Sequence, residues 1–331
     1  MPKPLVSVMM ITYNHASFVA RAIERVLRQK TAFPFELVIG EDHSTDGTRE
    51  IVFEYQAKYP HIIRIVSSDK NVGIQKNAYR TMKACRGKYI AFCEGDDYWV
   101  RTDKLKLQVE YLESHLECGM VSADCDIYYN KSGNFKRNYN HNHGFQSSIN
   151  LTAEQVLWRW LPIWTCTVMI RHSLYEQIVE NDPYLHQDAA LPLGDIQLWF
   201  ETAMISEVTY IPETLATYRV LSESVSRSRD VIKNLRFDQS LCDVRLYLCD
   251  KYNLSENCQR KAELSWCDTM LRKAFYTRDV DLATRVKMRT KTFTWKKWFM
   301  YFGVKYTAFY YTYLATLWLY KFFRKEQTKF P

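Results

Sequence analysis

The first hundred residues alternate between short apolar runs and amphipathic segments. Residues 5–11 are almost entirely apolar, which predicts a strand, and residues 16–29 place Val19, Ile23 and Val26 at helical spacing. The order repeats, with strands expected at 36–40, 62–66 and 88–93 and helices at 46–59, 73–85 and 103–115. Strands that alternate with helices predict an α/β domain built on a mostly parallel, doubly wound sheet.

The second half of the chain is predicted to extend this domain and then to become helical. Residues 130–150 are polar and rich in Asn and His, so we expect a mobile loop over or beside the site. Around it, strands are expected near 120–129, 165–171, 208–211 and 215–220, and helices near 152–160 and 195–206. From about residue 228 the pattern is helical. We therefore predict a domain over 1–227, with halves 1–117 and 118–227, and a helical extension over 228–331.

Polar groups stand at the ends of three of the predicted parallel strands. Tyr13 and Asn14 follow the first strand, Asp42 follows the second, and the acidic run 94–97 follows the fourth. Ligands of doubly wound sheets bind beyond the carboxyl ends of the strands. We therefore expect these residues to gather at one edge and to form the functional site.

The acidic run Glu94, Gly95, Asp96, Asp97 carries the clearest chemistry. Adjacent carboxylates repel one another, and a divalent cation that prefers oxygen ligands, Mn²⁺ or Mg²⁺, would relieve the repulsion. The aspartates could instead open a turn or cap the next helix. The residues alone fit both interpretations about equally well.

The amino-acid composition indicates the class of protein and the cellular compartment in which it works. Nearly half of the 331 residues are apolar, enough for a substantial core. The nine cysteines are scattered, odd in number and without a Cys-x-x-Cys pair, which favours a reducing compartment, and we expect no secretory signal at the amino terminus. Of the net charge of +8, residues 285–331 hold eleven Lys and Arg against Glu326, so the first 284 residues carry about −2 and nucleic-acid binding is disfavoured.

Several segments together resemble family 2 glycosyltransferases in order and spacing. They are VSVMMITYNH at 6–15, ELVIGEDHSTDGT at 36–48, Asn71-Val72-Gly73 with Asn77, GKYIAFCEGDDYW at 87–99, and residues 104–108. The resemblance covers roughly residues 5–225. It implies a Rossmann-like GT-A fold with a nucleotide-sugar-binding half and an acceptor-binding half. It also implies inverting, metal-assisted transfer from a nucleotide-diphospho-sugar, a UDP-sugar first of all, to a saccharide or lipid-linked saccharide in cell-surface polysaccharide or glycolipid assembly.

The resemblance also assigns donor-binding roles. It implies that Thr12, Tyr13 and Asp42 form the nucleotide base pocket, and that the acidic run meets the ribose and the metal, with Asp96 toward the nucleotide-sugar and Asp97, Asp96 and Glu94 toward the cation. Glu94 stands where the family more often has Asp, so the register of the metal ligands stays open. Asn14 is also assigned to nucleotide-sugar binding, and Asn71 and Asn77, which follow the third strand and could contact the base or phosphate, are weaker assignments.

Two later segments complete the resemblance. Residues 193–199 (LGDIQLW) resemble the motif whose acidic residue acts as catalytic base, which implies that role for Asp195; an N-cap is the structural alternative. Around Tyr218-Arg219-Val220, many members place a His beside the metal or diphosphate, where this chain has Leu221 and Ser222. Either the diphosphate and water complete the metal shell, or Arg219 supplies positive charge to the leaving group. A structural pair between Arg219 and a carboxylate is the alternative.

The tail between residues 295 and 323 is crowded with aromatic residues and flanked by lysines and arginines. Its uncharged stretch between Lys305 and Lys321 is shorter than the roughly 20 apolar residues of a spanning helix. We expect it to lie in a membrane interface and to hold the protein on the cytoplasmic, inner face of the cell membrane. Packing against the catalytic domain or an oligomer contact are the alternatives.

Two other functions share the predicted fold. A nucleotide-sugar-binding protein without turnover would keep the fold and lose catalytic residues, whereas this chain retains both the acidic run and Asp195. A sugar nucleotidyltransferase would be expected to carry a Gly-rich, basic loop after the first strand, where this chain has Thr12-Tyr13-Asn14-His15.

Overall fold

The computed structural model describes residues 3–187, 195–224, 227–290, 293–312 and 315–316. Two compact units divide the chain, Met1–Ser222 and Glu223–Pro331. The strands are β1 Val6–Thr12, β2 Phe35–Glu41, β3 Ile63–Val66, β4 Tyr89–Phe92, β5 Tyr98–Trp99, β6 Cys118–Tyr129, β7 Asn134–Lys136, β8 Ile149–Asn150, β9 Met169–Arg171 and β10 Glu207–Val220. The first unit's helices are α1 Val19–Leu27, α2 Thr48–Lys58, α3 Ile74–Ala84, α4 Lys104–Ser114, α5 Ala153–Leu157, α6 His172–Asn181, α7 Pro183–Gln187 and α8 Asp195–Ile205.

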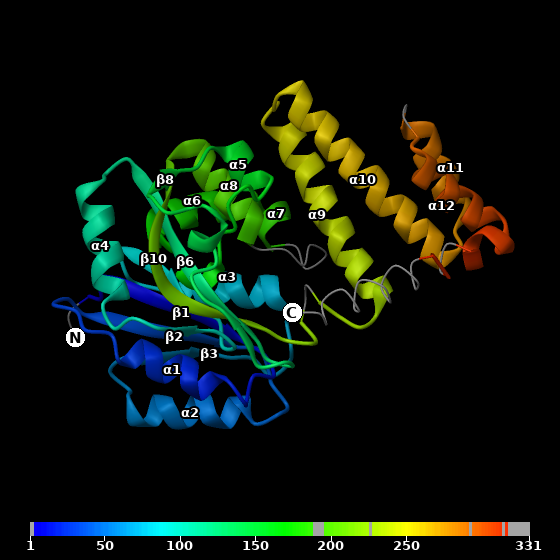
Figure 1. The fold of residues 1–331 in the computed structure, drawn as a ribbon. Helices are drawn as coiled ribbons and strands as arrows, with labels where there is room; N and C mark the ends of the chain where they lie inside the picture. Colours follow the sequence, from blue (N-terminus) through cyan, green and yellow to red (C-terminus); the bar gives the residue numbers. More distant parts are fainter. Residues whose placement is uncertain (1–2, 188–194, 225–226, 291–292, 313–314, 317–331) are drawn as a thin grey trace, which may run out of the picture. The chain divides into compact units, whose positions relative to one another are not determined.

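One mixed sheet organises the first unit, with the strand order β3-β2-β1-β4-β9-β6-β10-β5. The pairs among β3, β2, β1 and β4 are parallel, as predicted, while α1 and α2 cover one face and α3 the other (Figure 1). Burial on both faces explains the near-continuous apolar content of these strands. Beyond β4 the sheet departs from the simple pattern, because β9 runs antiparallel to both β4 and β6.

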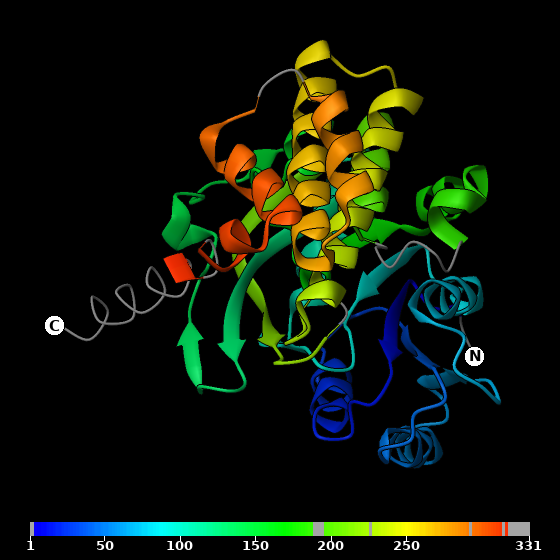
Figure 2. The same ribbon diagram turned by 90° about the vertical axis from the view of Figure 1, so that its right-hand side faces the viewer.

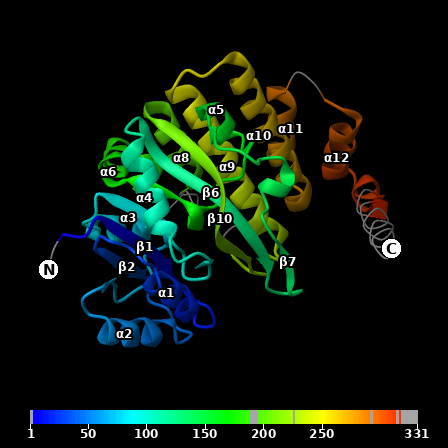
Figure 3. The same ribbon diagram turned by 60° about the vertical axis from the view of Figure 1, so that its left-hand side comes forward.

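The long strands β6 and β10 lie side by side in parallel and form the second half of the sheet (Figure 3). The sequence predicted two short strands at 208–211 and 215–220, but β10 is one strand whose register shifts between Ile211 and Ala216. Strand β5 pairs antiparallel with it, joining Tyr98 to Thr217. This pairing fixes Tyr98 and Trp99, which follow the acidic run, to the carboxyl-terminal part of β10.

Segment 130–150 is more structured than the predicted loop, with β7, β8 and a 3₁₀ turn at His141–His143. Two buried carboxylates on β6 organise it. Asp124 accepts hydrogen bonds from the backbone N–H of Asn140 at 2.7 Å and of His141 at 3.1 Å, and Asp126 accepts one from Asn138 at 2.9 Å. Hydrogen bonds from its backbone N–H groups therefore hold this polar segment in place, rather than the packing of an apolar face.

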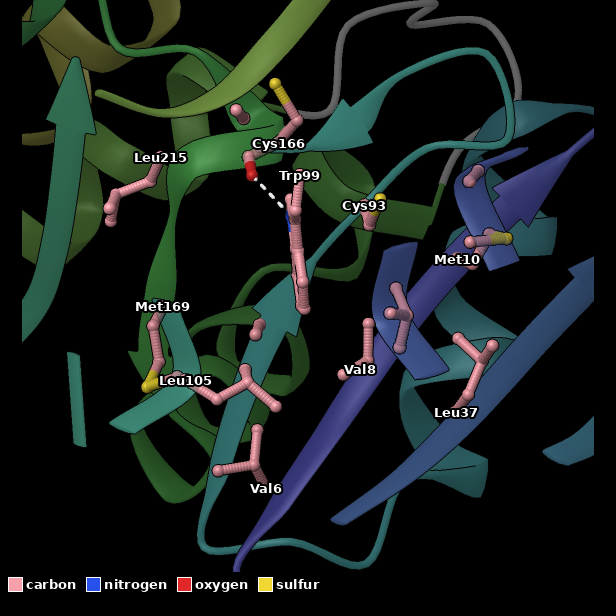
Figure 4. Packing of buried hydrophobic residues seen from close by; sticks show 14 of the residues in the cluster. Val6, Val8, Met10, Leu37, Cys93, Trp99, Leu105, Cys166, Met169 and Leu215 are labelled. Atoms are coloured by element: carbon pink, nitrogen blue, oxygen red, sulfur yellow. Dashed lines mark hydrogen bonds between the residues drawn. The ribbon is translucent and has the colours of Figure 1, made fainter. Parts of the chain in front are cut away.

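The core of the first unit is apolar and closely packed around Trp99. This side chain is 1% exposed, and its Nε1 donates to the carbonyl of Cys166 at 2.9 Å (Figure 4). All nine cysteines lie in described residues as buried free thiols, which agrees with the absence of a disulfide framework.

The second unit is helical, as predicted, and comprises α9 Val231–Lys251, α10 Glu256–Thr277, α11 Val280–Arg289 and α12 Trp295–Lys305. Helices α9 and α10 run side by side (Figure 2), and α11 and α12 pack on α10 around Phe275. In the part of the chain that the structure describes, no helix combines the length and the hydropathy needed to cross a membrane. Residues 317–331 lie outside the described residues, and they include Lys321, Arg324 and Lys325, the basic residues that follow the aromatic part of the predicted interfacial tail.

Candidate active site

The loops that follow β1 and β2 are joined into one rim by hydrogen bonds. The backbone N–H of Asn14 donates to the Ser44 hydroxyl at 3.0 Å, and the Asn14 side chain accepts from Thr45 N at 2.9 Å. Asp46 accepts from Ala16 N at 2.9 Å. Burial would raise the pKa of Asp46, but its hydrogen bonds from backbone and hydroxyl groups outweigh that effect and lower it. Asn14 is exposed, and its backbone and side-chain oxygen connect the two loops of the rim.

The first strand ends in two predicted donor-binding residues with different surroundings. Thr12 is 2% exposed, and its hydroxyl lies 3.2 Å from Nδ1 of His15. Tyr13 is 45% exposed. An exposed aromatic ring at the carboxyl end of a parallel strand is available to stack on a planar ligand, whereas the buried threonine positions its neighbours.

Asp42 holds a third loop against the same edge. Its two carboxylate oxygens accept hydrogen bonds from the backbone N–H of Val72 at 2.8 Å and of Gly73 at 3.0 Å. Asn71 is exposed on this loop and accepts a bond from Gly73, whereas Asn77 is buried and donates to a β2 carbonyl at 2.8 Å. The structure thus places Asp42 and Asn71 at the rim and Asn77 within the fold.

The acidic loop packs directly on the end of β1. Gly95 N donates to the Ile11 carbonyl at 3.1 Å, and Asp97 N donates to the Glu94 carbonyl at 3.1 Å. A Cβ atom at Gly95 would stand 2.5 Å from Oγ1 and 2.8 Å from Cβ of Thr12. Only glycine allows this approach, so the loop sequence brings the carboxylates onto the rim.

Burial and mutual repulsion dominate the electrostatics of the acidic loop. Burial raises the pKa of Glu94 to about 8, and the charges of Asp96 and Asp195 act in the same direction. Burial also raises the pKa of Asp97 well above its ordinary value, with further contributions from Cys166, Asp96 and Glu94. Asp96 is the more accessible carboxylate, with 19% of its side chain exposed.

Arg219 provides the positive charge beside the acidic loop. Its backbone N–H donates to the Asp97 carboxylate at 2.7 Å, and its Nε donates to the Asp96 carbonyl at 2.8 Å. The guanidinium lies over the rings of Phe18, Tyr98 and Tyr128 at 4.6, 5.6 and 5.4 Å. The buried arginine therefore fixes the loop conformation as well as compensating its charge.

His15 belongs to the site but received no role from the sequence. Its Nε2 lies 4.0 Å from Oδ2 of Asp96, and one fifth of its side chain is exposed. The available signal was its position directly after Tyr13 and Asn14, at the carboxyl end of β1. An imidazole there can orient the accessible carboxylate of the loop.

Asp195 starts α8 and is brought to the acidic loop by packing in the core. Trp199, one turn further along α8, meets Phe92 edge-on at 5.4 Å, and Phe92 ends the strand that leads into the acidic run. Asp195 accepts a hydrogen bond from Ile196 N at 2.7 Å, and its other oxygen lies 3.8 Å from the Arg159 guanidinium. Its side chain is 35% exposed, and its charge acts on Glu94. Leu193 and Gly194 of the predicted motif lie outside the described residues.

The acidic loop suits a divalent cation but does not enclose one. Glu94 has a buried oxygen, Oε2, without a hydrogen-bond partner in the described residues, and the pKa values of Glu94 and Asp97 are both raised. A cation would relieve both conditions. No group of three or more His, Cys, Asp or Glu side chains within the described residues is arranged as a metal site. The residues therefore fit a cation whose remaining ligands are diphosphate oxygens and water.

Fold and site together define a GT-A enzyme class: a mostly parallel sheet presents an acidic loop at its carboxyl edge, and a mixed second half carries a further carboxylate toward it. Residues 7–178 match the description "Glycosyl transferase family 2". The chain belongs to this family of glycosyltransferases.

Relatives agree with this assignment. An uncharacterised protein of Mycobacterium tuberculosis is 32% identical over 216 residues, which cover 64% of this chain and 58% of that protein. TuaG of Bacillus subtilis, named for teichuronic acid biosynthesis, is 28% identical over 69% of this chain and 83% of its own length. The matched part therefore spans little more than half of the mycobacterial relative.

Two solved structures share the fold. S. aureus TarS 1–349 in complex with UDP-GlcNAc has a TM-score of 0.56 at 16% identity, covering 90% of this chain and 79% of that one. The mannosyltransferase PcManGT of Pyrobaculum calidifontis, in complex with GDP-Man and Mn²⁺, has a TM-score of 0.56 at 15% identity, covering 94% and 86%.

Proposed function

We propose that this glycosyltransferase transfers a sugar from a nucleotide-diphospho-sugar, a UDP-sugar first of all, to an acceptor hydroxyl with inversion. The observation that carries the proposal is the approach of Asp195 to the acidic loop, close enough for its charge to raise the pKa of Glu94. A donor diphosphate at the loop and an acceptor hydroxyl at Asp195 would then face one another. The complexes of TarS with UDP-GlcNAc and of PcManGT with GDP-Man support a nucleotide-sugar donor, and the first of them supports a UDP-sugar.

In this scheme the rim binds the nucleotide. The exposed ring of Tyr13 stacks on the base, while Asp42 holds Asn71 and its neighbours at the edge of the base pocket. Asp96, the accessible carboxylate, faces the ribose and diphosphate, and His15 orients it. Arg219 acts on the donor indirectly, because its side chain is committed to the loop backbone and three aromatic rings.

Asp195 is the proposed catalytic base. Inversion requires a carboxylate that removes the proton of the attacking hydroxyl on the face opposite the leaving diphosphate. Its carboxylate is held in place by the hydrogen bond from Ile196 N at 2.7 Å and by the Arg159 guanidinium at 3.8 Å. Mn²⁺ or Mg²⁺, held by Asp96 with Asp97 and Glu94, would supply charge stabilisation for the departing diphosphate.

Substituting Asp195→Asn tests the proposal. We expect the variant to bind UDP with unchanged affinity and to lose about 10²–10⁴ in transfer rate, since general base catalysis contributes that much. Asp230→Asn is the matched control, because Asp230 caps α9 through Ile232 N at 2.7 Å and lies in the other unit. An Asp195→Asn protein with unchanged turnover would overturn the assignment of the base, and a wild-type protein that binds donor without turnover would favour a silent sugar-binding protein.

We also propose that the protein works on the inner face of the cell membrane, on a saccharide or lipid-linked saccharide acceptor in surface polysaccharide or glycolipid assembly. The name of TuaG supports the pathway. Trp295, Tyr306 and Tyr311 are 73, 56 and 64% exposed, next to Lys296 and Lys305. Exposed aromatic rings beside lysines suit the interface of an anionic membrane.

Vesicle sedimentation of the full chain tests this location. Replacing Trp295, Tyr306 and Tyr311 by serine should release the protein from anionic phosphatidylglycerol vesicles, because the interfacial aromatic rings are lost. Phe53→Ser, which removes a 42% exposed ring from the first unit, is the control. Equal sedimentation of the triple variant and the wild type would contradict the proposal.

A further inference from the structure

A cavity of about 460 Å³ lies in the first unit, and neither the residues of the donor rim nor Asp195 line it. Helix α1, strands β5, β6 and β10 and the β7 region surround it. It is lined by Arg21, Arg25, Tyr98, Val100, Asp126, Phe135, Arg137, Asn138, Thr214 and Thr217. Its volume is in the range of small-molecule sites, about 300–1,000 Å³.

The cavity has an excess of positive charge. Three guanidinium groups line it, and Asp126 is the one carboxylate among its described lining residues. The Asp126 carboxylate already accepts a hydrogen bond from the backbone N–H of Asn138 at 2.9 Å and forms an ion pair with Arg137 at 3.7 Å. Arg21 and Arg25 make no ion pair with a carboxylate in the described residues. Arg21, which is exposed, and Arg25, which is half-buried, therefore line the cavity without a carboxylate partner among those residues.

Nearby carboxylates do not remove this excess, because they have other partners. Glu24, also on α1, accepts a hydrogen bond from Tyr55 at 2.9 Å and pairs with Arg28. Glu213, beside the lining residue Thr214, pairs with Arg101 at 3.4 Å.

The proximity of these two arginines is unfavourable for the stability of helix α1. Arg21 and Arg25 are four residues apart on α1, so their like charges lie on the same face. Arg21 stands in the first turn, where the helix dipole disfavours a positive charge, whereas Arg25 stands in the last turn, where the dipole favours one. The Arg21 guanidinium is held over the Tyr98 ring at 3.7 Å, which fixes its orientation. An ordered, uncompensated arginine is suited to an anionic ligand, since its planar fork matches carboxylate and phosphate groups.

The cavity adjoins the proposed catalytic site through Tyr98. This residue directly follows Asp97, and its ring is contacted by Arg21 from the cavity and by Arg219 from the acidic loop. Its partner in the sheet, Thr217, also lines the cavity and has a buried hydroxyl without a hydrogen-bond partner in the described residues.

We propose that this cavity binds the anionic group, phosphate or carboxylate, of a saccharide acceptor. The proposal rests on the proposed transfer reaction and gives its acceptor a chemical class. Arg21 and Arg25 bind the anion, Arg137 adds charge at the β7 side, and Tyr98 links the occupied cavity to the acidic loop. A neutral sugar would leave the two arginines uncompensated.

Calorimetric titration of the full chain, with UDP saturating the donor site and ionic strength held constant, tests the proposal. The probes are glucose 6-phosphate, glucuronic acid and glucose. We expect one or both acids to bind with a Kd tighter than about 1 mM and glucose not to bind. Binding of only one acid identifies the anion as phosphate or carboxylate.

Arg25→Gln is the cleanest variant, because Arg25 makes no hydrogen bond or ion pair within the described residues, and it should weaken acid binding. Arg21→Gln/Arg25→Gln should weaken it at least about tenfold, since two charge-assisted hydrogen bonds are lost. Lys30→Gln removes an exposed charge outside the cavity and should leave binding unchanged. Equal binding by the double variant and the wild type, or no binding of either acid, would overturn the proposal.

Measuring UDP binding distinguishes a failure of the acceptor inference from a failure of the proposed function. If UDP binds and the acids do not, the acceptor inference alone is wrong. If UDP does not bind to the wild type, the proposed donor is wrong, while loss of acid binding in the double variant would still show an anion site.

Discussion

Replacing Lys104 by methionine should stabilise the protein at neutral pH. Lys104 has no exposed surface; its Nζ donates to Oε1 of Gln108 at 2.6 Å and lies 4.3 Å from the centre of the Trp99 ring. Burial lowers the pKa of this lysine from 10.5 to about 7, against smaller opposite effects of Cys93 and Cys166. Methionine fills a similar volume without a charge.

The magnitude follows from the difference between the folded and unfolded states. A pKa lowered from 10.5 to about 7 corresponds to a cost of charge burial of roughly 4 kcal/mol at pH 7, as an upper bound. The lost partner of Gln108 and the lost ring contact offset about 1–3 kcal/mol of that gain. We therefore expect Lys104→Met to be more stable than the wild type by roughly 1–3 kcal/mol at pH 7.

The sign of the pH dependence is fixed by proton binding. Between the folded pKa near 7 and the unfolded value near 10.5, the unfolded chain holds the proton that the folded chain has released, so wild-type stability rises with pH. From pH 7 to pH 9 this group alone contributes a rise of about 2 kcal/mol, which the methionine variant lacks. The advantage of the variant should shrink by that amount at pH 9.

Urea denaturation followed by tryptophan fluorescence at pH 7 and pH 9 measures both effects. Lys106→Met is the control, because Lys106 stands on the same helix with 57% of its side chain exposed and should show neither the gain nor the pH dependence. A Lys104→Met protein that is less stable than the wild type at pH 7, or that keeps the wild-type dependence on pH, would refute the reasoning.

Two further substitutions probe the acidic loop. Gly95→Ala should destabilise the protein by about 1–3 kcal/mol and weaken UDP binding, because its Cβ would stand 2.5 Å from the Thr12 hydroxyl; thermal unfolding and titration with UDP check this, and an unchanged variant would mean that the loop has room. Arg219→Lys should lower stability by roughly 1–3 kcal/mol, because lysine cannot reproduce the Nε bond to the Asp96 carbonyl while lying over three rings. If that variant retains stability but loses only donor affinity, Arg219 contacts the donor directly.

The parallel half of the sheet could be predicted because burial on both faces leaves a continuous apolar run in the sequence. Strands β1, β2 and β4 carry that signal, the edge strand β3 is interrupted by Arg64, and the order of the strands along the chain places their ends at one edge. Strand β5 has two residues, too few for any periodicity, and only its pairing with β10 makes it a strand. The strand predicted near 165–171 begins with a 3₁₀ turn at Thr165–Thr167, and only the three residues of β9 form a strand, through pairing with β4 and β6. Their existence depends on contacts distant in the sequence.

The same limit applies to the site. The sequence marked the acidic run and Asp195, but not that Trp199 against Phe92 would bring them together. It presented Arg21 and Arg25 as the polar side of an amphipathic helix, because the other walls of their cavity come from residues 98–100, 126–138 and 214–217. Whether a charged side chain faces solvent or a cavity is decided by those distant walls.

The departure at Glu94 from the common Asp of the family bears on the open register of the metal ligands. The structure buries Oε2 of Glu94, and burial is the largest cause of its raised pKa. One oxygen of Asp97 is occupied by Arg219 N, and its side chain is also buried. Asp96 alone of the three combines an accessible carboxylate with a nearby imidazole, that of His15. We therefore infer that Asp96 makes the first contact with the cation and diphosphate, and that the longer Glu94, whose pKa burial raises to about 8, adds negative charge from behind the loop only once a cation is bound.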